Sequence, residues 1–392
     1  MLHILRNIFL LSSLLFCFGQ TYSQETEAPK LKVVPSGRVL IDGALYASPE
    51  KYLFKDGLAI PEARLGVKMA YGKWSSWIDV GIAYGKIGLR NMWIQYDFNS
   101  HNSLRAGNFL QPFGYQGPTT ANNKATFEQP LVSALYTPGL QLGVMYTFQN
   151  RSFYSASSFH VESSALTNVM NYPQFNQQGY SILTRFVWRQ KNSGVDNKPI
   201  IQAGLSLGFS SPERTLKDNE DIHDGFTNSA NFPTKVSNVT AIAVAVGNAR
   251  NRFKLSPELL LSCRRIALES QYFFQTISRK PGYKSFNFQG AYVTLRGIIF
   301  GDNYSYDASI AHLGNPKKNT LELVADYNYA TLSDRKAGIF GGRANSFNFT
   351  LNYYFNPYIT ARLNYAFTHV WDREGETPMT QNAFQLRLMV LF

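Results

Sequence analysis

The chain of 392 residues carries a formal charge of +12, and 15% of its residues are aromatic while only 16% are charged. This composition, with 29 glycines, favours strands over helices. Beyond the N-terminus, no apolar run approaches the roughly 18 residues that a transmembrane helix requires, which excludes a helical membrane protein. The excess of basic residues favours anionic partners.

The N-terminus is typical of a secretory signal peptide. Arg6 supplies a positive start, an apolar core follows, and small residues lead to a cleavage site near Ser23. We therefore expect residues 1–23 to be removed and residues 24–36 to form a periplasmic lead-in. A membrane anchor is the alternative, but the apolar run is too short to span about 30 Å of hydrocarbon. Cys263 then remains as a single cysteine, which excludes an intramolecular disulfide and a cysteine-based zinc cluster.

Four consecutive segments alternate apolar and polar side chains with a period of two. They cover residues 38–46, 62–71, 77–84 and 91–98. This period indicates strands, and in each segment the charged residues lie on one face. Burying that face in a sandwich core would leave several charges without partners, each at a cost in free energy. A wet lumen removes that cost, so the pattern favours a water-facing barrel wall.

A long connection interrupts the pattern after a fifth strand at residues 104–109. Residues 111–139 hold four prolines together with apolar side chains such as Phe113, Tyr115 and Phe127. Connections of this length are uncommon inside compact domains and are usually functional or disordered. This one is too apolar for a disordered tail, so we expect it to fold inward and pack on the wall. A mobile external loop is the alternative.

The alternation resumes beyond this connection. Residues 210–235 are loop-like, and residues 239–246 are apolar without alternation, so both are assigned to an elaborate loop. The total is about sixteen strands, an even number as single-chain bacterial barrels require. The further predicted strands are residues 140–148, 152–160, 180–189, 201–209, 258–262, 266–273, 286–296, 321–330, 347–355, 359–367 and 382–392.

The last strand has the clearest two-sided pattern. Phe384 and Leu388 belong to its apolar face, Arg387 belongs to its polar face, and the chain stops on Phe392. Such a strand resembles the closing strand of bacterial outer-membrane barrels, whose last residues are read by the barrel assembly machinery. The predicted fold is an all-β, transmembrane antiparallel β-barrel of about 16 strands over residues 37–392, with a long third loop folded into the pore.

Short motifs that follow one another along nearly the whole mature chain resemble those of a known family. They are ARLGV (63–67), LRAGNFLQPFG (104–114), Ala125–Phe127 before Pro130 and Leu131, Glu258 with residues 269–272, residues 290–293 and 321–329, GGRANSFNFTLNYY (341–354) running on to Asn356 and Pro357, residues 363–365, and NAFQLRL (382–388). In this order they resemble the phosphate-selective porin O and P family of outer-membrane channels.

The resemblance implies a sixteen-stranded porin, assembled as a homotrimer, whose third loop narrows the pore. Residues 111–139 occupy the position of that loop. The partners implied are outer-membrane lipid and lipopolysaccharide, and small hydrophilic, in particular anionic, solutes. No cofactor is implied, and the protein is not expected to be an enzyme.

The expected pore lining departs from the family. Phosphate-selective members have ladders of Arg and Lys and a basic constriction, whereas this presumed loop holds only Lys124 and Glu128. Phosphate specificity is therefore not carried over. The inward basic positions are Arg38, Arg64, Lys68, Arg105, Arg185, Arg362 and Arg387, against the inward acidic positions Asp42, Glu62, Asp79, Asp97, Glu258, Glu269, Glu322 and Asp326.

Three basic residues are the strongest candidates for facing the bore. Arg64 and Arg105 lie on polar strand faces next to the presumed constriction, but each has an alternative role, which is to pair with Glu62 or Asp97 and hold the wall together. Lys124 either faces the bore or is a solvated loop lysine.

Other function classes are less well supported. No histidine lies in a G-x-S-x-G or H-E-x-x-H context, although a Ser–His pair from distant strands would escape notice. The acidic residues 218–224 lack the ligand spacing of an EF-hand, so a solvated loop is favoured over a calcium site. The scattered positive charge and the absence of a phosphate-binding motif argue against nucleic acid.

The function predicted from the sequence is passive diffusion of small hydrophilic solutes through an outer-membrane porin, with a preference for anions. A substrate-specific channel is one alternative. A barrel enzyme or an adhesin with a plugged bore is the alternative from another class.

Overall fold

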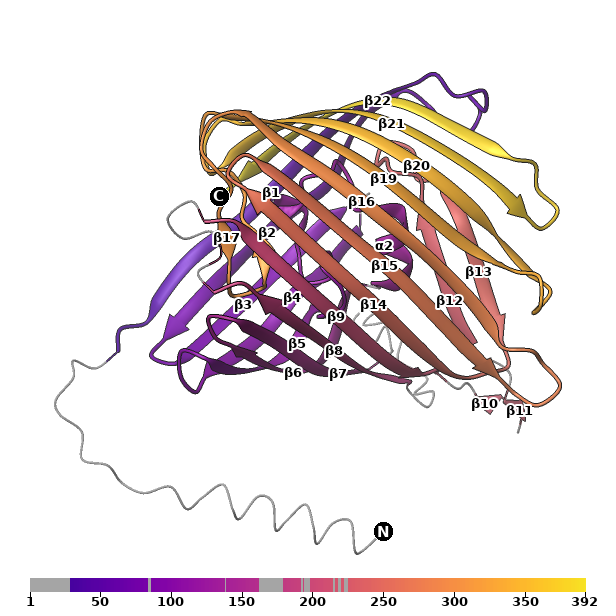
Figure 1. The fold of residues 1–392 in the computed structure, drawn as a ribbon, viewed down its shortest axis with the longest axis horizontal. Coiled ribbons are helices and arrows are strands. Elements are labelled where there is room, and N and C mark those ends of the chain that lie inside the picture. The colour runs from indigo at the N-terminus through magenta and orange to yellow at the C-terminus, as the bar shows by residue number, and fades with distance from the viewer. Residues whose placement is uncertain are drawn as a thin grey trace, which may run out of the picture.

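The computed structural model describes residues 29–83, 86–137, 139–161, 179–191, 193, 198–213, 216–217, 220–221 and 225–392, so the expected signal peptide lies outside the described residues. Sixteen antiparallel strands form one closed barrel (Figure 1). They are β1 (Lys32–Tyr46), β2 (Gly57–Tyr71), β3 (Trp74–Ala83), β4 (Lys86–Asp97), β5 (Asn102–Leu110), β6 (Leu140–Gln149), β7 (Phe153–Val161), β8 (Tyr180–Arg189), β9 (Ile200–Ser211), β14 (Ala249–Cys263), β15 (Ile266–Arg279), β16 (Phe286–Phe300), β19 (Thr320–Asp334), β20 (Ile339–Tyr354), β21 (Ile359–Arg373) and β22 (Met379–Leu391).

The first and last strands close the barrel. β1 and β22 pair continuously from Arg38 opposite Leu391 to Tyr46 opposite Ala383. Beyond the strand end, the Phe392 N–H donates to the Gly37 carbonyl over 3.1 Å and the Phe392 carbonyl accepts from the Gly37 N–H over 2.6 Å. Because hydrocarbon offers no partners to backbone polar groups, a membrane sheet must close in this way. The predicted sixteen-stranded barrel is confirmed.

The two faces of the wall differ as the alternation predicted. On β22, Phe384 and Leu386 are 59% and 50% exposed on the outside, whereas Gln385 and Arg387 are 4% and 2% exposed on the inside. The apolar face therefore points toward the position of the lipid, and the polar face points into the barrel.

Several strands are longer than the alternation indicated. β1 begins at Lys32, so residues 32–36 belong to the wall and not to the expected lead-in. β14 begins at Ala249 instead of residue 258. The missed part includes Pro257, which cannot donate a hydrogen bond to a ladder. Pairing between β14 and β15 does lapse at Pro257, but the strand continues because β9 pairs with this stretch.

Three connections fold toward the inside of the barrel. Residues 111–139 carry the short helices η1 (Ala121–Asn123) and α2 (Leu131–Tyr136). The connection between β9 and β14 carries β10 (Leu216–Lys217), β11 (Glu220–Asp221), β12 (Gly225–Asn231) and β13 (Thr240–Gly247), and the connection between β16 and β19 carries β17 (Tyr306–Asp307) and β18 (His312–Leu313). None of the helices described is long and apolar enough to cross a bilayer.

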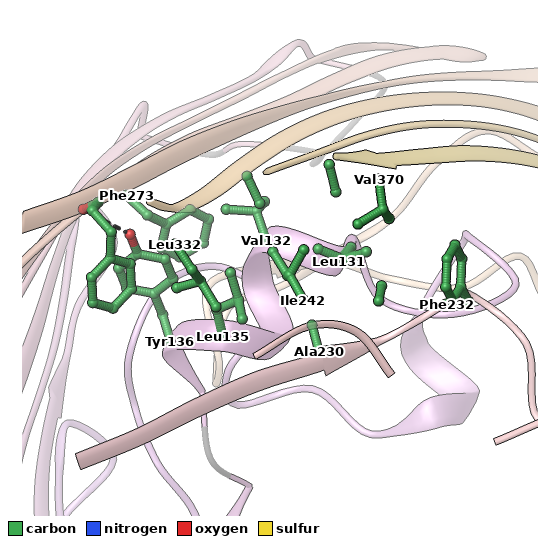
Figure 2. Close-up of a cluster of buried hydrophobic side chains, with 14 of the residues drawn as sticks. Leu131, Val132, Leu135, Tyr136, Ala230, Phe232, Ile242, Phe273, Leu332 and Val370 are labelled. Atoms are coloured by element: carbon green, nitrogen blue, oxygen red, sulfur yellow. Dashed lines mark hydrogen bonds between the residues drawn. The ribbon is translucent and has the colours of Figure 1, made fainter. Parts of the chain in front are cut away.

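A dry apolar cluster fills part of the lumen. Leu131, Val132 and Leu135 of α2 pack with Ile242 of β13, and the cluster reaches the wall at Leu332 (Figure 2). Residues 239–246 are therefore part of an inward hairpin, in which β13 pairs with β12, and not an irregular loop. The wet lumen expected from the alternation is therefore partly filled, because apolar side chains from two connections bury one another.

The same cluster accounts for the late start predicted for β20. This strand begins at Ile339 instead of residue 347. Its inward residue Ala344 is buried in the apolar cluster, as is Val370 on neighbouring β21. The outer face of the stretch before residue 347 carries Arg343 and Asn345 while Ala344 faces the apolar cluster, so the alternation of apolar outer and polar inner residues is reversed there and does not indicate the strand.

Connections from opposite ends of the barrel meet inside it. Residues 111–139 leave from the end opposite the chain termini, whereas residues 301–319 leave from the end that carries the C-terminus (Figure 1). The Leu313 N–H donates to the Tyr115 hydroxyl over 3.0 Å, and the Asn315 side-chain amide donates to the Asn122 carbonyl. The Tyr115 and His312 rings stack with centroids 4.0 Å apart.

Replacing Leu388 with Arg places a charge on the outer face of β22. We expect a loss of about 2–4 kcal/mol in the free energy of unfolding at the bilayer midplane, falling toward the interfaces, because lipid does not solvate a guanidinium. Guanidinium chloride unfolding of the protein folded into lipid vesicles measures this loss. Leu388→Ala is the matched control, and an unchanged stability of Leu388→Arg would show that this face does not meet lipid.

Candidate functional site

Arg387 joins the seam of the barrel to the inward connection 111–139. Its guanidinium contacts the Asp42 carboxylate on β1 and the Glu128 carboxylate, each at 2.6 Å, and donates to the Phe127 carbonyl over 2.6 Å. The guanidinium also lies 4.2 Å from the centre of the Phe127 ring. Burial opposes ionisation of Glu128, but the charges of Lys235 and Arg387 outweigh it and lower the Glu128 pKa to about 2. Glu128 is therefore a fixed anchor at neutral pH.

Two more of the predicted arginines contact the connection 111–139, and a third pairs within the wall. Arg362 donates to the Thr126 carbonyl over 3.1 Å. Arg38 pairs with Glu62 and donates to the Asn122 side chain over 3.2 Å. Arg64 pairs with Glu62 at 2.9 Å and lies 3.6 Å from the Asp79 carboxylate. Arg64 thus takes the wall-pairing role that the sequence left open.

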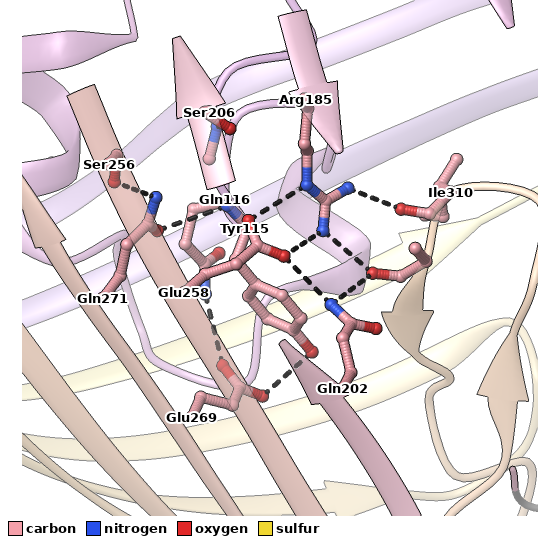
Figure 3. A network of polar contacts seen from close by, with 12 residues as sticks. Tyr115, Gln116, Arg185, Gln202, Ser206, Ser256, Glu258, Glu269, Gln271 and Ile310 are labelled. Atoms are coloured by element: carbon pink, nitrogen blue, oxygen red, sulfur yellow. Dashed lines mark hydrogen bonds and ion pairs between the residues drawn. The ribbon is translucent and has the colours of Figure 1, made fainter. Parts of the chain in front are cut away.

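Arg185 is the centre of a second buried network (Figure 3). Its guanidinium makes two bonds to Glu258, at 2.7 and 3.0 Å, and donates to the carbonyls of Ile310 and Ala311 at 2.7 and 3.0 Å. Gln202 donates to the same Glu258 carboxylate over 3.0 Å. Arg185 therefore ties β8 and β14 to the connection 301–319 and does not face solvent.

Arg296 was missed among the inward basic positions. Its guanidinium contacts Glu269 at 2.7 Å and Glu322 at 2.8 Å. Tyr304 donates to Glu322 over 2.7 Å, and the Tyr115 hydroxyl lies 3.4 Å from Glu269. The period of two along β16 carries the signal, because buried Tyr292 and Thr294 precede Arg296 on the same face.

Three further basic residues of the strands were not among the predicted inward positions. Arg189 donates to the carbonyls of Ala308 and Asn150. Lys254 donates to the Tyr136 carbonyl over 3.1 Å, and Arg252 donates to Ser210 over 3.1 Å. Arg252 and Lys254 lie in the part of β14 that precedes Pro257, which the alternation did not recognise. All three hold connections or neighbouring strands.

Three of the predicted basic residues remain, and they are Lys68, Arg105 and Lys124. None of them has a carboxylate within 4 Å in the part of the chain that the structure describes. The Lys68 ammonium lies 4.7 Å from the Trp77 ring, and the Arg105 guanidinium lies 4.1 Å from the Trp93 ring. Lys124 donates to Gln129 over 2.9 Å. Burial is the main cause that lowers the pKa of Lys124, to about 8, against the attraction of Glu128.

Of these three cations, Arg105 lines a cavity of about 720 Å³. It is bounded by strands β3 to β7 on one side and by the connections 111–139 and 301–319 on the other. Its size and mixed lining suit a small solute. The wall residues that line it include Trp77, Trp93, Gln95, Arg105, Phe109 and Tyr154.

The described residues hold no group of three or more His, Cys, Asp or Glu side chains that could bind a metal. Most of the acidic residues 218–224 lie outside the described part, so the calcium alternative stays untested there. Exposed Cys263 is a free thiol at the end of β14. Charged and aromatic side chains thus line the barrel interior, as they line the pores of channels.

A closed sixteen-stranded barrel with an apolar outer face, a polar inner face and a partly filled lumen defines an outer-membrane porin. The sequence model of the family described as phosphate-selective porin O and P matches residues 37–392. The chain belongs to that family. Comparison with curated protein sequences gave no match.

Solved structures share the fold at low sequence identity. OmpT expressed in the outer membrane of Vibrio cholerae is similar with a TM-score of 0.58 and 10% identity, over 95% of this chain and 100% of that one. A trimer form of the same protein, folded in vitro, gives 0.56 and 10% over 92% and 99%. An anion-selective porin from Comamonas acidovorans gives 0.55 and 12% over 93% and 100%.

Glu258→Gln removes the charge that balances buried Arg185. We expect a loss of about 3–5 kcal/mol in the free energy of unfolding, because an unpaired buried guanidinium is left behind. Glu376→Gln is the control, since Glu376 pairs with Arg373 at the surface, where such pairs contribute about 0–1 kcal/mol. Denaturant unfolding in detergent micelles measures both variants, and equal stabilities would contradict the anchoring role of Arg185.

Proposed function

We propose that this chain forms an outer-membrane channel through which small hydrophilic solutes diffuse passively, with anions preferred over cations. Support comes first from the family and the fold, and then from the arrangement of charge beside the cavity. Lys68, Arg105 and Lys124 have no carboxylate within 4 Å among the described residues, whereas Arg185, Arg296 and Arg387 each do. Arg105 lines the cavity, and a cation without a carboxylate partner on a wet wall raises the local concentration of anions.

The connection 111–139 is proposed to act as the constriction of this channel. Its backbone carbonyls and Glu128 are bonded to Arg362 and Arg387, which keeps it against the wall. Phosphate selectivity is not part of the proposal. The buried arginines that might have formed a basic ladder are already bonded to carboxylates and carbonyls.

A plugged barrel is the second candidate. The observation that favours it is the apolar cluster of α2 and the β12–β13 hairpin, which fills part of the lumen. Such a barrel would act as an adhesin or an enzyme and would carry no steady current. A channel that binds one solute specifically is intermediate between the two candidates, because its current would be blocked by that solute.

The proposal also covers the export and assembly of the protein. Residues 1–23 are cleaved as a signal peptide, the assembly machinery reads the strand that ends at Phe392, and the folded barrel forms a homotrimer among lipid and lipopolysaccharide. Mass spectrometry of the mature protein tests the cleavage site. Migration on a mild gel, with and without heating, tests the trimer, and a species that runs only as a monomer without heating would contradict it.

Single-channel recording in a planar bilayer separates the candidates. A porin gives steady open steps, whereas a plugged barrel gives none. The reversal potential across a KCl gradient then reports the ion preference. We expect a value on the chloride side, and a value at zero or on the potassium side would remove the anion preference.

The anion preference is expected to depend on pH through Lys124. Because the Lys124 pKa is lowered to about 8, its ammonium is charged below this pH and neutral above it. The anion preference should therefore fall as the pH rises from 7 to 9, and Lys124→Gln should remove that dependence. Lys336→Gln, a change at an exposed lysine between β19 and β20, is the control. A wild-type reversal potential that is constant across this range would contradict a role for Lys124.

A further inference from the structure

The cavity beside β3 to β7 opens toward one end of the barrel. Gly72 lies between β2 and β3, and Gln149 ends β6, so these lining residues lie at the end from which β1 starts. Pro118 of the connection 111–139 and Ile310 of the connection 301–319 close the opposite side. The cavity thus lies between the barrel end at which β1 begins and the two inward connections.

Arg105 is one of the charged side chains that line this cavity, together with Lys73 and Asp97. Its Nε and Nη2 atoms donate to the Gln95 side-chain oxygen over 3.0 and 2.7 Å. The guanidinium lies 4.1 Å from the centre of the Trp93 ring and 5.8 Å from that of Phe109. Its Nη1 atom has no hydrogen-bond partner in the described part of the chain and is not enclosed.

Gln95 keeps a carboxylate away from this arginine. Its amide nitrogen donates to Asp97 over 2.8 Å, while its oxygen accepts from Arg105. The amide therefore stands between the two charges and orients the guanidinium. In the Arg185, Arg296 and Arg387 networks a carboxylate contacts the guanidinium directly, so Arg105 differs from them in being oriented without being neutralised.

The surroundings of Arg105 are apolar as well as polar. Phe109, Met145 and Pro112 line the pocket with carbon surface. A guanidinium binds a carboxylate through parallel N–H bonds, and a flat apolar body gains from contact with ring and thioether surfaces. A dianion would gain nothing from these surfaces and would be repelled by Asp97, which lines the same pocket.

We infer that this pocket binds small organic monocarboxylates with an apolar body, with the carboxylate on Arg105 and the body against Phe109 and Met145. The inference rests on the proposed channel function and names the solute class that the channel would favour. Gln95 acts as a positioning residue, because it holds the guanidinium without touching the solute.

Block of the single-channel current by added solutes tests the inference. Benzoate carries both the charge and the apolar ring, acetate carries the charge alone, and benzyl alcohol carries the ring alone. We expect benzoate to block at a concentration at least tenfold lower than either. Inorganic phosphate and glucose should also block at least tenfold more weakly than benzoate. Block by acetate, benzyl alcohol, phosphate or glucose that equals or exceeds block by benzoate would overturn the inference.

Variants of Arg105 make the test specific. Arg105→Gln should weaken benzoate block at least tenfold, and Arg105→Lys should recover only part of it, because an ammonium lacks the planar fork. Arg343→Gln is the control, since Arg343 lies on β20 and pairs with Asp372 at 2.9 Å. Heat-dependent gel migration checks that each variant folds. Equal benzoate block in Arg105→Gln and the wild type would overturn the assignment.

Calorimetry of benzoate binding to the folded barrel in detergent separates this inference from the channel proposal. If the barrels carry no current but bind benzoate through Arg105, the channel proposal is contradicted and the carboxylate site is supported. If the barrels conduct but benzoate neither binds nor blocks the current, the channel proposal is supported and the carboxylate site is overturned.

Discussion

The pairing of β1 with β22 is the constraint on which the rest of the structure depends. A sheet in hydrocarbon has no water to satisfy its edges, so the ribbon must close on itself. The register from Arg38 to Tyr46 achieves this, and the backbone of Phe392 extends the seam to Gly37. Closure fixes which side of every strand meets lipid. It also creates an enclosed interior, where charged side chains must find either water or one another.

Most of the interior charge finds protein partners. Arg387 binds the Asp42 and Glu128 carboxylates, and Arg185 binds Glu258 together with carbonyls of the connection 301–319. These pairs hold the inward connections in place, since a buried guanidinium is costly without its partner. A count of inward arginines is therefore a poor guide to ion selectivity. Arg105 has no carboxylate within 4 Å among the described residues and lines the cavity, so it is placed to act on a solute.

The fold was predictable because lipid and water impose a period of two on each strand. The order of the sixteen strands and the outward rows on β22 follow from that period. The β12–β13 hairpin could not be predicted from that period, because β13 is apolar without alternation and packs on α2 inside the lumen. Candidate arginines such as Arg185 and Arg387 are buried on the inner side of the wall. Their partners were not predictable, because Glu128 and Arg387 are separated by 259 residues and meet only after the barrel closes.

Connections from opposite ends of the barrel meet inside it, beside the cavity that β3 to β7 line. The contact of Asn122 with Asn315 is the most direct consequence of this meeting. Cysteines placed at both positions, with Cys263 replaced by serine, can be joined by a short thiol cross-linker in the lipid-embedded protein. We expect efficient cross-linking within one chain and an unchanged single-channel conductance. Absence of the cross-link, or a conductance altered by it, would contradict the claim.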